Sequence, residues 1–158
     1  MLRATAMALT LFGALATPAF ANGLKAEQVV EVATVSVDAS GNEVRTYALA
    51  EEVAPGDEVR YSLSYANEGS EPAEAVSLVM PVPEAVTYIE TSAGGTPSTI
   101  TYSVDGGANF ADRDSLVVAG DDGARLAIAD EITHIKWAFV EPIPAAATGE
   151  ISFRAILK

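Results

Sequence analysis

The sequence predicts an all-β fold: an antiparallel immunoglobulin-like β-sandwich of about seven to nine short strands, preceded by a cleaved signal peptide. Short runs rich in β-branched residues alternate with Gly, Pro, Asn and Asp turn signals at the spacing of a sandwich. No segment shows a convincing amphipathic helix. An uncharged N-terminal stretch ends in small residues. The 158 residues suffice for one domain with its own core.

The first half of the chain contains five predicted strands. The Val- and Thr-rich run 27–37 and its hairpin partner 43–49 flank the turn residues 38–42. The strand 58–66 is the clearest, because Tyr61 and every second residue around it are apolar while the residues between are polar. The run 75–80 stops at a Pro-Val-Pro segment, which cannot donate a full ladder of backbone hydrogen bonds. The fifth strand is 86–90.

The second half contains four more predicted strands. The run 99–104 ends at the hairpin signal Asp105-Gly106-Gly107, and 116–119 is short. The runs 132–140 and 151–157 both alternate apolar and polar residues. We expect the large apolar side chains on these alternating strands to form the core: Tyr61, Trp137, Phe139 and Phe153.

Residues 1–21 have the three parts of a signal peptide: a basic start at Arg3, an uncharged stretch rich in Ala and Leu, and a small-x-small end at Ala19 and Ala21. A retained membrane anchor is the competing interpretation, since about 18 uncharged residues lie near the lower limit for spanning a bilayer. Pro18 and the cleavage pattern favour removal. We therefore expect a single exported domain over 22–158, with its core over about 27–158, in the periplasm, on the cell surface or in the medium.

Charge and composition exclude several functions. The 22 acidic and 9 basic residues give a net charge of −13, whereas affinity for nucleic acid comes from cations that neutralise phosphates. The chain contains no Cys, which excludes disulfides, thiolate zinc sites, cysteine nucleophiles and a lipid anchor on cysteine. His134 is the single imidazole, and no nucleophile elbow or phosphate-binding Gly loop is present. We expect no enzyme, no catalytic residue and no bound organic cofactor.

One loop contains a group of oxygen ligands. Asp105, Asn109, Asp112 and Asp114 fall within ten residues of each other, and hard oxygen ligands on loops are what calcium prefers. The spacing is not that of an EF-hand, and surface loops of an acidic protein collect Asp without any ligand. The sequence leaves two interpretations open, a calcium loop and a plain solvated loop, and favours the second.

Several segments together resemble the bacterial secreted "conserved repeat" domains of the DUF11 group. The segments that carry the resemblance are Val53-Ala54-Pro55-Gly56-Asp57-Glu58-Val59 with Tyr61, Tyr65-Ala66-Asn67-Glu68-Gly69, Pro81-Val82-Pro83, Tyr102-Ser103-Val104-Asp105-Gly106-Gly107, Thr133-His134-Ile135-Lys136-Trp137 and Gly149-Glu150-Ile151-Ser152-Phe153. The resemblance spans roughly 27–158. It implies an immunoglobulin-like sandwich, an exported or surface location and a structural or adhesive role, with no catalytic residues.

These observations favour a non-enzymatic exported structural or interaction domain. Its expected partners are proteins, including copies of itself, with no nucleic acid and no stable membrane insertion after cleavage. A sharper version is self-assembly into surface fibres by strand addition, with the segment 22–37 as the donated strand; the plainer alternative makes this segment the first strand of its own domain. The alternative function is a loop-based ligand-binding module for calcium, a glycan or a surface polymer.

Overall fold

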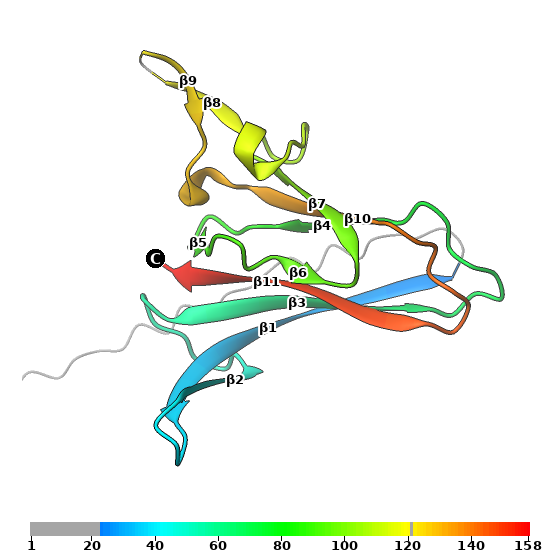
Figure 1. Cartoon of the computed structure of the whole chain (residues 1–158), viewed down its shortest axis with the longest axis horizontal. Helices are drawn as coiled ribbons and strands as arrows, with labels where there is room; N and C mark the ends of the chain where they lie inside the picture. Colours follow the sequence, from blue (N-terminus) through cyan, green and yellow to red (C-terminus); the bar gives the residue numbers. More distant parts are fainter. Residues whose placement is uncertain (1–22, 121) are drawn as a thin grey trace, which may run out of the picture.

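The computed structural model describes residues 23–120 and 122–158; the predicted leader and its cleavage site at Ala19 and Ala21 lie outside this range. Within it the chain is all-β, with eleven strands that pair only in antiparallel fashion, two short 3-10 helices and no α-helix (Figure 1). No helix in this part of the chain is long and apolar enough to cross a bilayer.

The elements follow one another along the chain without large insertions. They are β1 (Leu24–Val37), β2 (Glu43–Leu49), β3 (Glu58–Asn67), β4 (Ser77–Pro81), β5 (Val86–Tyr88), β6 (Gly94–Gly95), β7 (Ser98–Ser103), η1 (Arg113–Ser115), β8 (Val117–Gly120), β9 (Gly123–Leu126), η2 (Ala129–Glu131), β10 (His134–Phe139) and β11 (Thr148–Leu157).

Each of the nine predicted runs overlaps an observed strand, and the prediction of seven to nine strands was too low because it missed β6 and β9. β6 is a pair of glycines and β9 is exposed throughout, so neither has an alternating apolar pattern. β4 begins at Ser77 rather than at Ala75, because Ala75 has a φ of 51°, which an extended strand does not allow.

The strands form three sheets. The largest has the order β2-β1-β3-β11-β5, with β6 also paired to β11. A second sheet has the order β4-β10-β7, and β8 with β9 forms a separate two-stranded ribbon. Figure 1 shows the first two sheets lying over one another, with the β8–β9 ribbon standing away from them.

One apolar core lies between the two larger sheets. The rings of Tyr61 and Phe153 stack within the first sheet at 4.9 Å, and Tyr65 reaches Phe139 of the second sheet at 5.1 Å. Tyr61, Trp137 and Phe153 are buried as expected. Phe139 is only half-buried, because β10 ends at this residue and its ring lies at the margin of the core.

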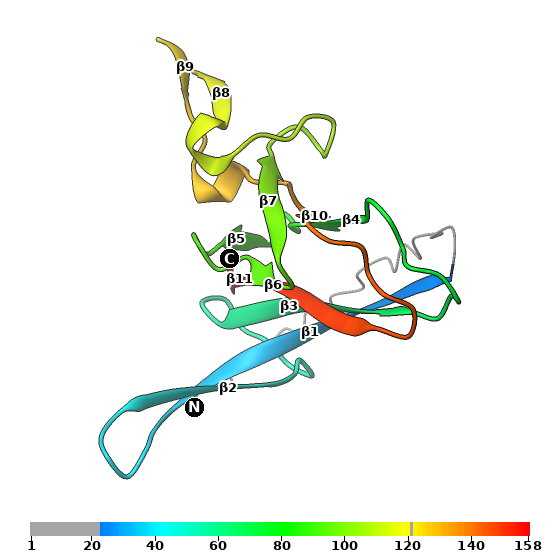
Figure 2. The ribbon, with the colours of Figure 1, turned by 45° about the vertical axis from the view of Figure 1, so that its right-hand side comes forward.

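The β1–β2 hairpin extends beyond this core (Figure 2). β1 has 14 residues and pairs with β3 over 24–32 and with β2 over 31–37. Its last four residues are exposed, and so are all residues of β2 except Tyr47. The sheet therefore continues into solvent as a two-stranded ribbon that nothing covers within the described part of the chain.

Candidate functional site

The structure places Asp105 and Asn109 together, but as partners of each other. The Asp105 carboxylate accepts hydrogen bonds from the Ser103 hydroxyl at 2.7 Å, from the Asn109 amide nitrogen Nδ2 at 2.7 Å and from the Asn109 backbone N–H at 2.9 Å. The bonds from Ser103 and Asn109 hold the pKa of Asp105 well below its ordinary value. Side-chain acceptance of local N–H groups is what stabilises Asx turns, so these contacts account for Asp105 without a ligand.

The turn of the β1–β2 hairpin is built in the same way. The Asp38 carboxylate accepts from the Asn42 backbone N–H at 2.9 Å and from Asn42 Nδ2 at 3.2 Å, four residues further on. The spacing Asp-x-x-x-Asn is therefore common to the two loops. This repeated spacing is a sequence signal for a turn motif in both loops.

Asp112 and Asp114 do not join Asp105 in a ligand set. Asp112 precedes η1 without capping it, and Asp114 lies within η1. Across residues 23–120 and 122–158, no three His, Cys, Asp or Glu side chains lie close enough to hold a metal ion. The structure therefore does not assemble the predicted calcium ligands around a common point.

His134 opens β10 and packs beside the same turn. Gly107 lies against the imidazole ring, and the ring nitrogen Nδ1 is buried without a hydrogen-bond partner in the described residues. Burial lowers the pKa of His134, and the charge of Asp105 opposes this change in part. The imidazole is thus held mainly by packing.

A polar cluster covers the outer face of the large sheet, where β2, β3 and β11 lie near one another. Glu58 accepts a hydrogen bond from the Tyr47 hydroxyl at 2.8 Å and one from Arg154 at 3.0 Å, and Arg45 lies 3.5 Å away. Arg60 lies over the Tyr47 ring, 4.3 Å from its centroid. Sequence reasoning missed this cluster, although the charged residues alternate with apolar ones along each strand.

Electrostatics explain why Glu58 is charged there. Burial alone would raise the pKa of the carboxyl, but the hydrogen bonds from Tyr47 and Arg154 and the charge of Arg45 outweigh burial and lower it. Burial and the bond to Glu58 raise the pKa of Tyr47. The cluster satisfies its own charges and anchors the base of the hairpin to the sheet.

The outer edge of β2 is free of any partner within residues 23–120 and 122–158. β2 ends the strand order of its sheet, and no other strand in the described ranges pairs with it. Large apolar side chains of the hairpin are exposed: Val35, Val37, Val44 and Leu49, with Leu49 at 68%. An exposed edge of this kind presents unpaired N–H and C=O groups that another strand can bind.

Backbone hydrogen bonds show which residues of β2 face this edge. The Asp38 N–H donates to the Asn42 carbonyl and the Ala50 N–H donates to the Val30 carbonyl. Because hydrogen-bonded pairs alternate along an antiparallel ladder, the even-numbered residues of β2 turn their backbone groups to β1. The N–H and C=O groups of the odd-numbered residues point to the free edge: Glu43, Arg45, Tyr47 and Leu49.

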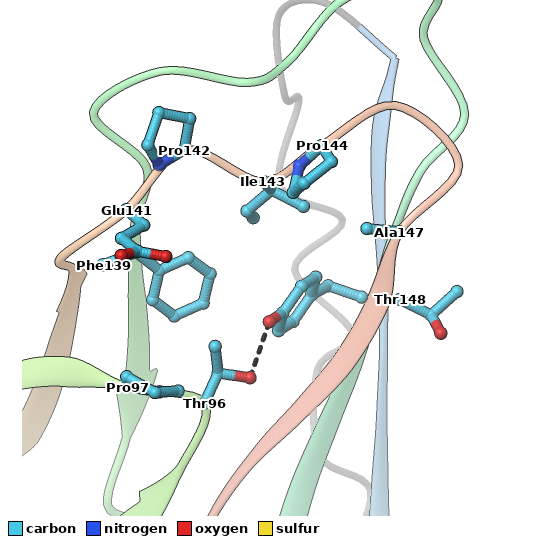
Figure 3. Close-up of a pocket in the computed structure, with 10 residues that line it drawn as sticks. Thr96, Pro97, Phe139, Glu141, Pro142, Ile143, Pro144, Ala147 and Thr148 are labelled. Atoms are coloured by element: carbon cyan, nitrogen blue, oxygen red, sulfur yellow. Dashed lines mark hydrogen bonds between the residues drawn. The ribbon is translucent and has the colours of Figure 1, made fainter.

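A pocket of about 250 Å³ lies at the opposite end of the core, under the loop between β10 and β11. Figure 3 shows Phe139 and Thr96 on two sides of the pocket, with the Glu141 carboxylate beside the Phe139 ring. Tyr65 also lines the pocket, and its hydroxyl is hydrogen-bonded to the Thr96 hydroxyl at 2.6 Å. Three prolines also line the pocket: Pro97, Pro142 and Pro144. The pocket thus combines aromatic surface with one carboxylate.

Comparisons with protein families, with curated proteins and with solved structures find no match for this chain. The resemblance to DUF11 domains stays a prediction from the sequence.

Proposed function

We propose that this chain is a non-enzymatic, exported structural or interaction domain with an immunoglobulin-like sandwich, and that it associates with other copies of itself by strand addition at the free edge of β2. The observation that carries the proposal is the protruding hairpin, whose edge strand has seven residues and is exposed on both faces. Backbone hydrogen bonds along an edge supply affinity, and the alternating side chains supply specificity.

Two features support the sandwich and the exported location. The two larger sheets share one core, and aromatic pairs such as Tyr65–Phe139 and Tyr88–Tyr102 join them. The small-x-small pattern at Ala19 and Ala21 supports export. Domains of this architecture commonly present their contacts at edges and loops.

The position of β1 changes the role of the N-terminal segment in this proposal. β1 lies between β2 and β3, with Leu24 buried opposite Asn67. If β1 were donated to a second copy, it would lose its pairing with both β2 and β3, and Leu24 would become exposed. We therefore assign the accepting edge to β2 and keep β1 as a strand of its own domain.

Proline substitution tests the edge directly. Arg45→Pro removes a backbone N–H that points outward, so it blocks strand addition while the ladder to β1 stays intact. Light scattering and electron microscopy of the purified full chain are expected to show assemblies for the wild type and a monomer for Arg45→Pro.

Arg45→Ala is the matched control, because it removes the same charge and keeps the N–H. It is expected to assemble as the wild type does. A wild-type chain that stays monomeric at every concentration contradicts the proposal.

The pocket beside Phe139 favours a second candidate, a loop-based ligand-binding module. Aromatic surface next to a carboxylate suits a saccharide or an organic cation. Titration of the protein with simple hexoses and with butylamine, followed by NMR, tests this candidate. Shifts of the Phe139 and Tyr65 ring signals that disappear in Glu141→Gln would support it, and unchanged spectra at millimolar concentrations would eliminate it.

A further inference from the structure

We infer that two copies of this chain pair through β2 in one antiparallel register, with a two-fold axis at Thr46. This inference rests on the proposed self-association and adds its symmetry and its register.

The backbone limits the registers. Two copies that meet edge to edge exchange hydrogen bonds only between residues whose N–H and C=O groups point outward, which are the odd-numbered residues of β2. Under two-fold symmetry, the axis then lies midway between the two copies of one residue of β2, and the register is named after that residue. Five positions place it within the strand and away from its two ends, and these are residues 44 to 48.

Charge eliminates two of these five positions. An axis at Arg45 places the two Arg45 side chains directly opposite each other, and an axis at Tyr47 places Glu43 opposite Glu51 of the second copy. Like charges directly opposite each other destabilise an antiparallel pair. The chain already carries a net charge of −13, so a further acidic contact adds to an existing repulsion between copies.

The length of β2 eliminates two more positions of the axis. An axis at Val44 pairs Tyr47 with Gly41, which lies in the hairpin turn with a φ of 85°. An axis at Ala48 pairs Arg45 with Glu51, which lies beyond the end of β2 at Leu49. Both registers leave part of β2 opposite backbone that is not extended.

An axis at Thr46 pairs the whole strand. Glu43 lies opposite Leu49 of the second copy and Arg45 lies opposite Tyr47, so every outward N–H and C=O group of β2 finds a partner. The even-numbered residues of β2, whose backbone groups bond to β1, form non-hydrogen-bonded pairs between the copies. In these pairs Val44 lies opposite Ala48, and Thr46 lies opposite Thr46. No side chain meets one of like charge directly across this interface.

In this register Arg45 of each copy lies opposite the uncharged side chain of Tyr47 of the other. Within each copy Tyr47 is bonded to the Glu58 carboxylate and Arg45 lies 3.5 Å from the same carboxylate. The pairing leaves these contacts in place and brings no like charges directly opposite each other. In each monomer Arg45 and Thr46 are exposed, so neither has to be uncovered before the copies meet.

The symmetry has a consequence for assembly. An isologous two-fold contact uses the same edge on both copies and closes into a dimer, whereas an open fibre needs a head-to-tail contact. Pairing through β2 therefore yields a dimer with one continuous sheet. A fibre would require a second surface elsewhere on the molecule.

The absence of cysteine makes a direct test available. In the Thr46 register the two Cα atoms at this position lie about 4.5 Å apart, within the range of about 4.4–6.8 Å that a disulfide spans. Single variants Thr46→Cys, Val44→Cys and Ala48→Cys of the full chain are oxidised under mild conditions and compared on non-reducing gels. We expect about ten-fold more linked dimer for Thr46→Cys than for either of the others.

A mixture of the two flanking variants sharpens the result. Val44→Cys mixed with Ala48→Cys is expected to form the heterodisulfide, because these residues lie opposite each other across the axis. Emission from the single Trp137, fully buried in the core, verifies that each variant is folded.

Three outcomes overturn the register. Equal cross-linking of all three variants indicates an edge without a fixed register, and preferred linkage at Val44 or Ala48 moves the axis to that residue. Dimers in light scattering without any disulfide indicate a different interface, which contradicts this inference but not self-association. A monomer in light scattering for the wild type and every variant removes the proposed self-association itself.

Discussion

The body of the molecule and the tip of the β1–β2 hairpin have the same alternating sequence pattern but different surroundings. In the body, β3 and β11 place Tyr61 and Phe153 against a second sheet, and both side chains are buried. In the hairpin, Val44 lies on the same face of the sheet as these residues but no second sheet of the described chain covers it, and it is 38% exposed. Val37 and Leu49 lie on the opposite face and are 67% and 68% exposed. Alternation thus determines which side chains share a face, and a facing sheet determines whether that face becomes core.

The largest expected effect lies in the body. Phe153→Ala removes a fully buried ring and leaves a cavity, so we expect it to lower the free energy of unfolding by about 3–5 kcal/mol. Val37→Ala in the hairpin is expected to change it by less than about 0.5 kcal/mol. Urea denaturation followed by Trp137 emission measures both, and similar losses for the two variants would contradict the comparison.

The second-largest expected loss of stability is at Gly149, where the chain is tightly packed. A Cβ at Gly149 would overlap the Tyr65 side chain, which crosses β11 at this point to reach Thr96. Gly149→Ala is expected to lower the free energy of unfolding by about 1–3 kcal/mol, because Tyr65 must move out of its place in the core.

Gly94→Ala is the matched control, because a Cβ at Gly94 meets nothing within 4 Å. A thermal melt of each variant compares the two positions. Equal stability of the two variants would show that Tyr65 is not held against β11.

The polar cluster at the base of the hairpin gives a smaller, pH-dependent effect. The folded-state pKa of Glu58 is lowered from its ordinary value of 4.5, so the charged form stabilises the fold above pH 4.5 and this contribution is lost as the pH falls through the folded-state pKa. Glu58→Gln is expected to lower the free energy of unfolding by about 1–2 kcal/mol at pH 7. The difference between wild type and variant shrinks toward pH 3.

Glu68→Gln is the control, since Glu68 pairs with Lys25 where both side chains are largely exposed, at 53% and 72%. Exposed ion pairs contribute about 0–1 kcal/mol to the free energy of unfolding. Urea denaturation at pH 7 and at pH 3 measures both variants. A Glu58→Gln difference that does not depend on pH would contradict a stabilising charge at this position.

The smallest effect concerns association through the hairpin. Because each copy carries a net charge of −13, repulsion opposes pairing and salt screens it. Raising the salt from about 0.02 M to about 0.3 M is expected to strengthen association by about two- to ten-fold in sedimentation experiments. Weaker association at high salt would indicate an interface dominated by opposite charges.

Sequence alone determined the all-β class and the faces of the main strands. The alternation in 58–66 and 151–157 identified Tyr61 and Phe153 as core residues, because successive side chains in a strand point to opposite faces. The strand 43–49 has the bounds predicted for it. This information is local, so it is present in a window of a few residues.

Tertiary structure decided what those elements do. The position of β1 between β2 and β3, the free edge of β2 and the half-buried state of Phe139 all depend on strands that lie far apart in the sequence. The acidic loop differs, because Asp105 bonds to Ser103 and Asn109, which are its near neighbours in the sequence, while Asp112 and Asp114 lie before and within η1. Which distant segments pair depends on which apolar faces are buried together in the common core, and a local sequence pattern does not hold this information.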